Sequence, residues 1–360
     1  MQLKNLQLFN FRSHKQKNFT FTKEVTTFVG PNATGKTNIL EAVTLLALGK
    51  SFRADKDEEM ITFEEEFGRI SGEVEDESLE VVLTHGTWQG KPVAKKRFVV
   101  NGVGKRRKDF MGRLKVVLFE PQDIQLVVGS PGHKRAYLDF VLSQIDWEYD
   151  RSLLSYQKGL RQRNKLLSAI AEGKAHENQL EFWNRLLIKN GEILRKKRDE
   201  YVTFLNTYCS SAQFREIMDR NLEDIPYFTF IYDPSTISPE RLLKYHQAEI
   251  ASSRTLIGPH RDTFSIFQQN HKKRDLATYG SRGEQRMGVL ALKMGELEFI
   301  TQKTGKRPLL LLDDIFSELD KNHQKMVLNI ITKQQTLIAT TEVRFIEKPV
   351  QTTMELVTLD

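Results

Sequence analysis

The chain has 360 residues, of which 28% are charged and 39% hydrophobic, a composition typical of a globular protein with room for two or three domains. No apolar run approaches the roughly 18 residues that cross a bilayer, and the N-terminus lacks the features of a signal peptide. The single cysteine, Cys209, excludes an internal disulfide. We therefore exclude a membrane-embedded or secreted protein and expect a cytoplasmic one.

The net charge of +7 is distributed in blocks. Residues 51–80 carry 12 acidic and 3 basic side chains, whereas residues 91–115 carry 10 basic and 1 acidic side chain. Residues 151–200 carry 12 basic and 6 acidic side chains. Concentrated positive charge is typical of a surface that binds a polyanion, but a solvated helix face gives the same pattern. Charge alone leaves both interpretations open.

The first 125 residues are predicted to be mostly β-structure. Apolar and polar residues alternate as in strands over residues 1–9, 67–74, 79–83 and 97–100. The dipeptide Asn101-Gly102 then predicts a hairpin turn. A helix at about 36–48 follows a short apolar strand at 25–29, and a buried strand is expected at 115–119.

From residue 130 to about 222 the apolar period becomes helical. This segment is too short for a long coiled-coil arm and suits a compact helical lid. Beyond it we predict strands at 227–232, 263–267, 309–312 and 336–340, and helices at about 282–302 and 322–333.

A phosphate-binding loop is predicted between the strand at 25–29 and the helix at 36–48. It consists of Gly30, Pro31, Asn32, Ala33, Thr34, Gly35, Lys36, Thr37 and Asn38, with the spacing G-x-x-x-x-G-K-[ST]. The two glycines allow backbone N–H groups to surround a phosphate at the start of the helix. Lys36 would reach the β- and γ-phosphates, and the Thr37 hydroxyl would hold Mg²⁺. The cofactors expected from this loop are ATP and Mg²⁺.

An acidic pair follows the buried strand at 309–312. Asp313 would bind Mg²⁺ directly or through water, because this hard ion prefers oxygen ligands. Asp314 would polarise the attacking water as the catalytic residue. The pair lies far along the chain from Lys36, which argues against Ras-like GTPases and small kinases. It favours an ATPase whose nucleotide fold is split by insertions.

A second anion site is predicted where the helix at 282–302 begins. Ser281 is a good N-cap, and Gly283 leaves backbone N–H groups accessible at the helix start. A polar turn, Ser317-Glu318-Leu319-Asp320, follows the acidic strand. This arrangement resembles the ATP-binding cassette, which has a signature motif, an acidic strand and a D-loop in that order. In that family the signature of one subunit caps the γ-phosphate held by the other, so ATP joins two heads. The signature residues by this resemblance are Ser281, Arg282, Gly283, Glu284 and Gln285.

More narrowly, the chain resembles the RecF family of bacterial recombinational repair. The matching stretches occur in the family's order over nearly the whole chain: Phe11-Arg12-Ser13, 30–38, Ser51-Phe52-Arg53, 119–123, Gly129-Ser130-Pro131, 258–262, Gly283-Glu284-Gln285-Arg286 and 311–320. This family is related to the heads of SMC proteins but lacks their long arms. The resemblance therefore agrees with the short helical insertion.

The resemblance assigns further roles to single residues. Gln122 lies near the Q-loop position that senses Mg²⁺ and the γ-phosphate, and Arg12 either reaches the phosphates or closes the end of a strand. Thr340 and the next threonine occupy the position of the transporters' switch histidine, so we do not expect a histidine-based mechanism. Ala33 replaces an expected glycine at a cost of about 1 kcal/mol if its φ is positive. Asp314 is shorter than the usual glutamate, and both departures favour slow hydrolysis.

Contact with DNA is expected at two basic clusters, which contain Lys105, Arg106, Arg107 and Lys108, and Arg195, Lys196, Lys197 and Arg198. Neither cluster carries a base-reading motif, so binding should be to phosphates and largely independent of sequence. His260, Arg261 and Asp262 lack an accompanying nucleophile motif, and we expect them to have a structural or interface role.

The predicted fold is α/β: a P-loop ATPase head of the ABC/SMC type with a split, mixed sheet and an inserted helical lid subdomain. Residues 1–129 would form the N-terminal ATPase lobe with the P-loop, and residues 130–225 the helical lid. Residues 226–360 would form the C-terminal lobe with signature, acidic strand and D-loop.

The resemblance implies an ATP-dependent protein that binds double- and single-stranded DNA. It would form an ATP-dependent homodimer at DNA gaps and support RecA loading beside RecO and RecR, replication and SOS induction. We expect at most a weak, DNA-stimulated ATPase that does not associate with membranes. The alternatives are a transporter-type cassette, another SMC-like head, a head coupled to a nuclease, and a DNA-binding scaffold with a non-hydrolysing nucleotide site.

Overall fold

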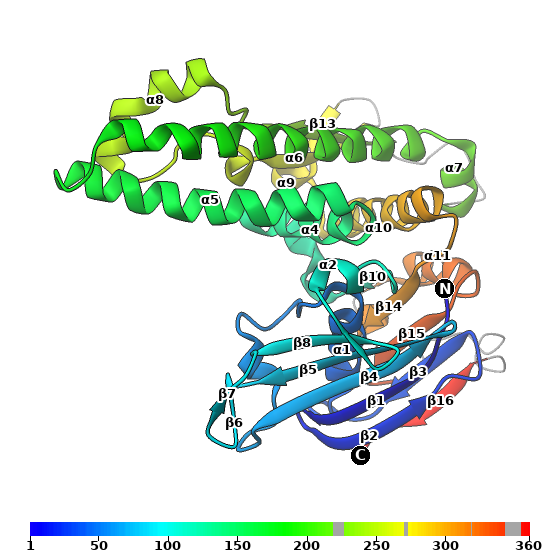
Figure 1. Ribbon diagram of the computed structural model, residues 1–360. Coiled ribbons are helices and arrows are strands. Elements are labelled where there is room, and N and C mark those ends of the chain that lie inside the picture. The colour runs from blue at the N-terminus through cyan, green and yellow to red at the C-terminus, as the bar shows by residue number, and fades with distance from the viewer. Residues whose placement is uncertain (219–226, 270–272, 318, 343–353) are drawn as a thin grey trace. The chain divides into compact units, whose positions relative to one another are not determined.

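The structure, a computed structural model, describes residues 1–218, 227–269, 273–317, 319–342 and 354–360 (Figure 1). The chain divides into two compact units. Unit 1 is built mainly from Met1–Asp123 and Glu296–Asp360, and unit 2 from Ile124–Glu216 and the residues up to Gly295. Helix α10 (Arg282–Thr304) contributes residues to both units.

Unit 1 contains two main sheets. The antiparallel sheet has the strand order β2 (His14–Thr20), β1 (Leu3–Phe11), β4 (Phe67–Val74), β5 (Glu77–Thr84), β8 (Lys96–Val100) and β9 (Val103–Lys105). The parallel sheet has the order β10 (Val116–Phe119), β14 (Leu309–Asp313), β15 (Thr336–Thr340), β3 (Val25–Val29) and β16 (Glu355–Thr358). The remaining elements are the hairpin β6 (Thr87–Trp88) and β7 (Lys91–Pro92), the helices α1 (Lys36–Leu48), α2 (Arg107–Phe110) and α11 (Lys321–Ile331), and short 3-10 turns at Asp57–Met60, Pro121–Ile124 and Ile315–Ser317.

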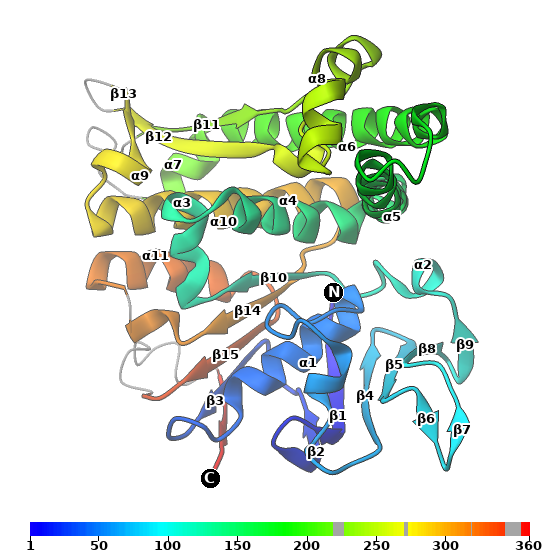
Figure 2. The ribbon, with the colours of Figure 1, turned by 90° about the vertical axis from the view of Figure 1, so that its left-hand side faces the viewer.

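The amino-acid pattern explains how these elements pack. Strands β14 and β15 are buried along their whole length, as expected for parallel strands covered on both faces. In β4 buried residues alternate with more exposed ones, because an antiparallel sheet can leave one face in water. Helix α1 contacts strands of both sheets and lies between them (Figure 2), which explains why every residue of Ile39–Leu48 is buried.

Unit 2 is mainly helical. Its helices are α3 (Gln125–Val128), α4 (Pro131–Ile145), α5 (Trp147–Ala171), α6 (Leu180–Cys209), α7 (Ala212–Met218), α8 (Pro239–Ser252) and α9 (Leu276–Tyr279), with 3-10 turns at Glu177–Gln179 and Pro259–Arg261. A small antiparallel sheet contains β11 (Tyr227–Asp233), β12 (Thr263–Gln269) and β13 (Lys273–Asp275). Helices α5 and α6 run antiparallel, since Arg163 binds Asn184 while Tyr149, at the start of α5, binds Arg198 near the end of α6.

Most predicted elements are present, including the hairpin at Asn101-Gly102, where both residues have positive φ. The main strands of unit 1 form one antiparallel and one parallel sheet, which agrees with the predicted split of the sheet. One feature differs from the expectation. Residues 227–295, expected in the C-terminal lobe, pack in unit 2, because β11 lies along α6 and Asn206 exchanges hydrogen bonds with the backbone of Phe230. Among the described residues, no helix is both long and apolar enough to cross a membrane.

Candidate functional site

The predicted nucleotide residues of unit 1 meet at one edge of the parallel sheet. Val29 pairs with Thr340, Ala339 with Asp313, and Leu312 with Phe119. The carboxyl ends of β3, β15, β14 and β10 therefore lie together. In open α/β sheets this edge is where ligands bind. The phosphate-binding loop, the acidic pair and the segment that carries the exposed Gln122 all begin at this edge.

The phosphate-binding loop has the backbone that its glycines allow. Gly35 has φ 90°, and a Cβ at this position would lie 2.6 Å from the imidazole of His14. A Cβ at Gly30 would clash with the carbonyl oxygen of Leu359, just after β16. Ala33 also has a positive φ of 71°, so the expected strain at this non-glycine residue is present. Asn32 and Ala33 are exposed at the tip of the loop.

Lys36 is buried and folds back onto its own loop. Its ammonium donates hydrogen bonds to the carbonyl oxygens of Gly30 at 2.7 Å and Pro31 at 2.6 Å. Burial lowers the pKa of Lys36, and the carboxylates of Asp314 and Asp313 oppose that shift. The ammonium therefore sits within the loop, close to the acidic pair.

Thr37 and Asp313 are in direct contact. The Thr37 hydroxyl donates to Asp313 Oδ1 at 2.8 Å. Burial raises the pKa of Asp313, whereas the Thr37 hydrogen bond and the positive charges of Arg53 and Lys36 oppose the rise. Two oxygen ligands thus lie side by side at the first turn of α1, as a hard divalent cation requires.

Asp314 has a fixed and unusual backbone conformation. Its N–H donates to the Ala339 carbonyl at 2.8 Å, and its own carbonyl accepts from the Ser317 hydroxyl at 2.8 Å. Its φ is 48°, in the left-handed region that costs energy for a non-glycine residue. Such strain is found more often at functional sites than elsewhere. Glu318 of the predicted D-loop lies outside the described residues.

The signature residues belong to unit 2, where they form a capped helix start. The Ser281 hydroxyl accepts from the Glu284 N–H at 3.3 Å, and Glu284 Oε2 accepts from the Ser281 N–H at 2.7 Å. This reciprocal pair is a capping box, and it lowers the pKa of Glu284. Gly283 is exposed, and a Cβ there would meet no described atom within 4 Å. The start of α10 is therefore open to a ligand.

Comparison with known proteins agrees with this geometry. The model of the RecF/RecN/SMC N terminal domain matches residues 2–358. The DNA replication and repair protein RecF of Bacillus cytotoxicus is 35% identical over 362 residues, which cover 96% of this chain and 94% of that protein. This chain belongs to the RecF family.

Solved structures extend the likeness to three dimensions. A structure of the recombination mediator protein RecF-ATPrS in the RecFOR pathway matches with a TM-score of 0.84 and 32% identity, covering 96% of this chain and 94% of that one. An SmcHead bound to the C-winged helix domain of ScpA matches with a TM-score of 0.53 at 15% identity, covering 96% and 91%. The second match shows the fold alone, which is that of an SMC head.

Arg12 binds a buried carboxylate of α1. Its guanidinium donates to both carboxylate oxygens of Glu41, at 2.9 and 2.7 Å, and to the Glu59 carbonyl at 2.7 Å. Glu41 is fully buried in α1 and also accepts from the Ser51 hydroxyl at 2.5 Å. In this RecF-family chain Arg12 therefore fastens the end of β1 to α1, and its contact with the phosphates stays a prediction.

Two neighbours of the loop were not identified from the sequence. His14 Nε2 lies 3.1 Å from the Gly35 carbonyl, and the Ser13 hydroxyl accepts from Asn38 at 3.0 Å. Burial lowers the pKa of His14. Ser13 and Arg53 belong to stretches that resemble the family. No spacing rule, however, connects Ser13, His14 or Arg53 with the phosphate-binding loop.

The first basic cluster, residues 105–108, runs from the end of β9 into the short helix α2. Lys105, Arg106 and Lys108 are exposed, and Arg107 is partly exposed. Arg106 forms an ion pair with Asp109 at 3.0 Å, and both side chains remain accessible. This cluster can therefore present its charge to a polyanion.

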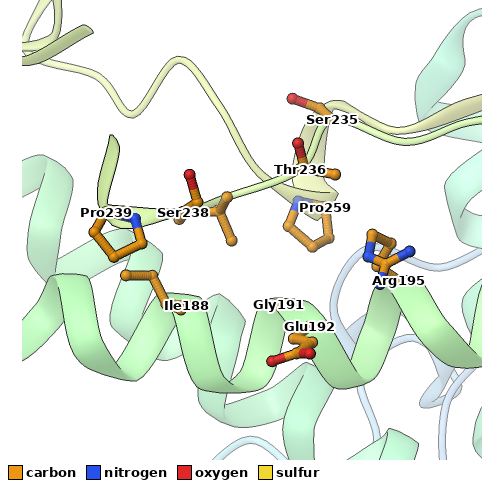
Figure 3. A pocket seen from close by; sticks show the side chains of 10 residues that line it. Ile188, Gly191, Glu192, Arg195, Ser235, Thr236, Ser238, Pro239 and Pro259 are labelled. Carbon is orange, nitrogen blue, oxygen red and sulfur yellow. The ribbon is translucent and has the colours of Figure 1, made fainter. Parts of the chain in front are cut away.

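The second basic cluster does not form one surface. Arg198 is only 2% exposed and binds Asp139 and Asp262 at 2.8 Å each. Lys197 pairs with Asp146 at 2.6 Å. Arg195 lines a cavity of about 280 Å³ between α6 and the segment before α8 (Figure 3). The expectation that Arg198 contacts DNA is wrong, because the helix turns this side chain into the core.

Asp262 belongs to the same buried network as Arg198, and the nearby His260 is partly buried with partners of its own. Asp262 accepts from the Arg198 guanidinium, the Tyr232 hydroxyl and the Ser235 N–H. His260 contacts the Tyr156 hydroxyl at 2.9 Å and the Thr255 carbonyl at 3.0 Å. Burial lowers the pKa of His260 to about 4. These contacts support the expected structural role.

Proposed function

We propose that this RecF-family chain is an ATP-dependent DNA-binding protein of recombinational repair. ATP would join two copies at DNA gaps, and this dimer would support RecA loading, replication and SOS induction. Hydrolysis would then release the dimer. The observation that carries this proposal is the 2.8 Å contact between Thr37 and Asp313 beside the phosphate-binding loop. Relatives that are DNA replication and repair proteins support it.

The loop suits a nucleotide triphosphate with magnesium. Lys36 would exchange its two backbone carbonyl partners for the β- and γ-phosphates. Thr37 and Asp313 would hold Mg²⁺, which needs only one or two protein oxygens when phosphates supply others. Bound Mg²⁺ would neutralise charge on the phosphates. Asp314 would accept a proton from the attacking water, and Gln122 would sense the occupied site.

Dimerisation is proposed to depend on the start of α10. Ser281–Gln285 would meet the γ-phosphate held by the other copy, because the open helix start offers backbone N–H groups to an anion. Unit 1 would act as the ATPase lobe that holds the nucleotide, and unit 2, which carries Ser281–Gln285, would present the signature to the other copy. The capping box supports a rigid helix start but does not by itself identify the ligand.

DNA would contact the exposed cluster at 105–108 through its phosphates. Four cations without a base-reading element favour binding to double- and single-stranded DNA with little sequence preference. The RecFOR pathway named for the structural relative supports RecO- and RecR-type mediators as partners.

A scaffold that binds ATP without hydrolysing it is the second candidate. It is favoured by Ala33, whose φ of 71° strains the loop where glycine would not. The leading proposal instead expects a weak, DNA-stimulated ATPase.

Turnover in the Asp314→Asn and Lys36→Ala variants, each with and without DNA, separates the candidates. The amide cannot accept a proton, so Asp314→Asn should bind ATP normally and hydrolyse it at least about 100-fold more slowly. Lys36→Ala should lose ATP binding and sets the background rate. Wild-type turnover equal to that background would favour the scaffold, and undiminished turnover in Asp314→Asn would remove Asp314 from catalysis.

A further inference from the structure

We propose that a groove on the α5–α6 hairpin is a docking site for an acidic segment of a partner protein that carries one bulky apolar side chain. The groove is open, has a volume of about 440 Å³ and lies wholly within unit 2. Its lining includes Arg151 of α5 and Phe182, Arg185, Leu186 and Lys189 of α6. It shares no residue with the predicted nucleotide or DNA sites.

The charge of the groove selects an acidic partner. Three of its lining residues are cations, and none of the described residues that line it is acidic. Arg185 reaches Glu181 at 3.5 Å, but both side chains are more than 70% exposed, and such a pair is weak in water. The groove therefore keeps a positive potential that would draw carboxylates.

Exposed apolar side chains lie in the groove, at Phe182, and elsewhere on α5, at Leu154 and Trp147. Phe182 is 58% exposed, Leu154 is 48% exposed and Trp147 is 50% exposed. Arg151 lies over the Trp147 ring at 5.2 Å. Leu154 follows Arg151 by three residues, so the two lie on the same helix face. Aromatic and arginine side chains that surround a concave site are typical of protein–protein interfaces.

Single-stranded DNA fits the groove less well. Its bases need successive exposed ring faces on which to stack. Phe182 is the one aromatic residue among the described lining residues, and Trp183 packs edge-on against it at 4.9 Å and 81°. The Trp147 ring is covered by Arg151. The other apolar lining residue that the structure describes is Leu186, which suits an inserted protein side chain.

The test measures fluorescence anisotropy of the full-length protein with short peptides in which Asp and Glu flank one Phe, Trp or Leu. We expect saturable binding that weakens at least about tenfold in the double variant Arg185→Glu/Lys189→Glu. Changing the central residue of the peptide to Ala, or Phe182→Ala in the protein, should also weaken it. The matched control Lys174→Glu/Lys244→Glu changes the net charge equally at exposed sites of unit 2 outside the groove and should bind as the wild type does.

Equal weakening in both double variants would show unspecific charge attraction and overturn the proposal. It would also be overturned if the peptide with a central Ala bound as tightly as the others, or if no peptide bound. Binding of an oligo-dT strand that depends on Arg185 and Phe182 and displaces the peptide would assign the groove to DNA instead. Circular dichroism and thermal unfolding establish that each variant is folded, and Phe182→Ala keeps the peptide test valid if a charge reversal unfolds unit 2.

Discussion

The two basic clusters contain four cations each, yet the fold uses them in opposite ways. Residues 105–108 follow a tight turn and present three exposed cations and one that is partly exposed. In residues 195–198 only Lys196 is fully accessible, while Lys197 and Arg198 bind carboxylates of α4, the α4–α5 junction and the 258–262 segment.

The difference follows from helix geometry. Successive residues of an α-helix are separated by about 100° around its axis, so four consecutive cations on a packed helix cannot all face water. Residues 105–108 instead run from the end of β9 into the single turn of α2, where only Phe110 is buried. A run of charge in a sequence therefore identifies a candidate surface only when its secondary structure is also known.

The largest expected effect on this comparison is the loss of folding stability in the Arg198→Ala variant. The change leaves Asp139 and Asp262 buried without their guanidinium partner, and breaking a buried ion pair costs about 3–5 kcal/mol. Chemical denaturation should show this loss in the free energy of unfolding. The free energy of unfolding of Lys196→Ala should stay within about 0.5 kcal/mol of the wild-type value. A small effect at Arg198 would mean that this cluster is a surface after all.

The next effect is a pH dependence of stability from His260, which contacts Tyr156 and Thr255 in unit 2. Its pKa is lowered from 6.5 to about 4, so between these values the unfolded chain binds a proton that the folded chain does not. The contribution of this residue to the free energy of unfolding is fully present above pH 6.5. It falls by roughly 3 kcal/mol as the pH approaches 4. Denaturation of wild type and His260→Gln over this range measures it. Parallel curves for the two proteins would contradict the prediction.

The smallest effect concerns the exposed cluster. Replacing Lys105, Arg106, Arg107 and Lys108 by Ala should lower the slope of log affinity against log salt on duplex DNA by about 0.9 for each lost phosphate contact. ATP binding and stability should remain near those of the wild type. Lys196→Ala serves as the control. An unchanged slope in the quadruple variant, with a lower slope in the control, would reverse the comparison.

Local pattern was sufficient for elements with strong periodicity or motif spacing. The helix at 36–48 was predicted with its observed bounds, because the phosphate-binding loop fixes its start and apolar residues continue to Leu48. Strand β16 was missed, because it is four residues long and alternates weakly. The pairing of Lys36 and Thr37 with the acidic strand followed from the order of motifs.

Contacts between residues far apart in the chain could not be predicted in this way. Arg198 lies 59 residues from Asp139 and 64 from Asp262, and no pattern along the sequence connects them. Arg12 was assigned two roles, because its partner Glu41 becomes visible only when β1 and α1 are packed together. The position of His14 against Gly35 depends on the same packing.

Sedimentation of the protein with and without ATP–Mg²⁺, in the presence and absence of duplex DNA, tests the central claim that nucleotide at this loop joins two copies. Wild type should shift from monomer to dimer with ATP, and Lys36→Ala should remain a monomer. Ser281→Arg should bind ATP as a monomer but not dimerise, because a bulky side chain would block the facing phosphate. Full ATP-dependent dimerisation of Lys36→Ala, or a wild type that stays monomeric with both ATP and DNA, would contradict the account.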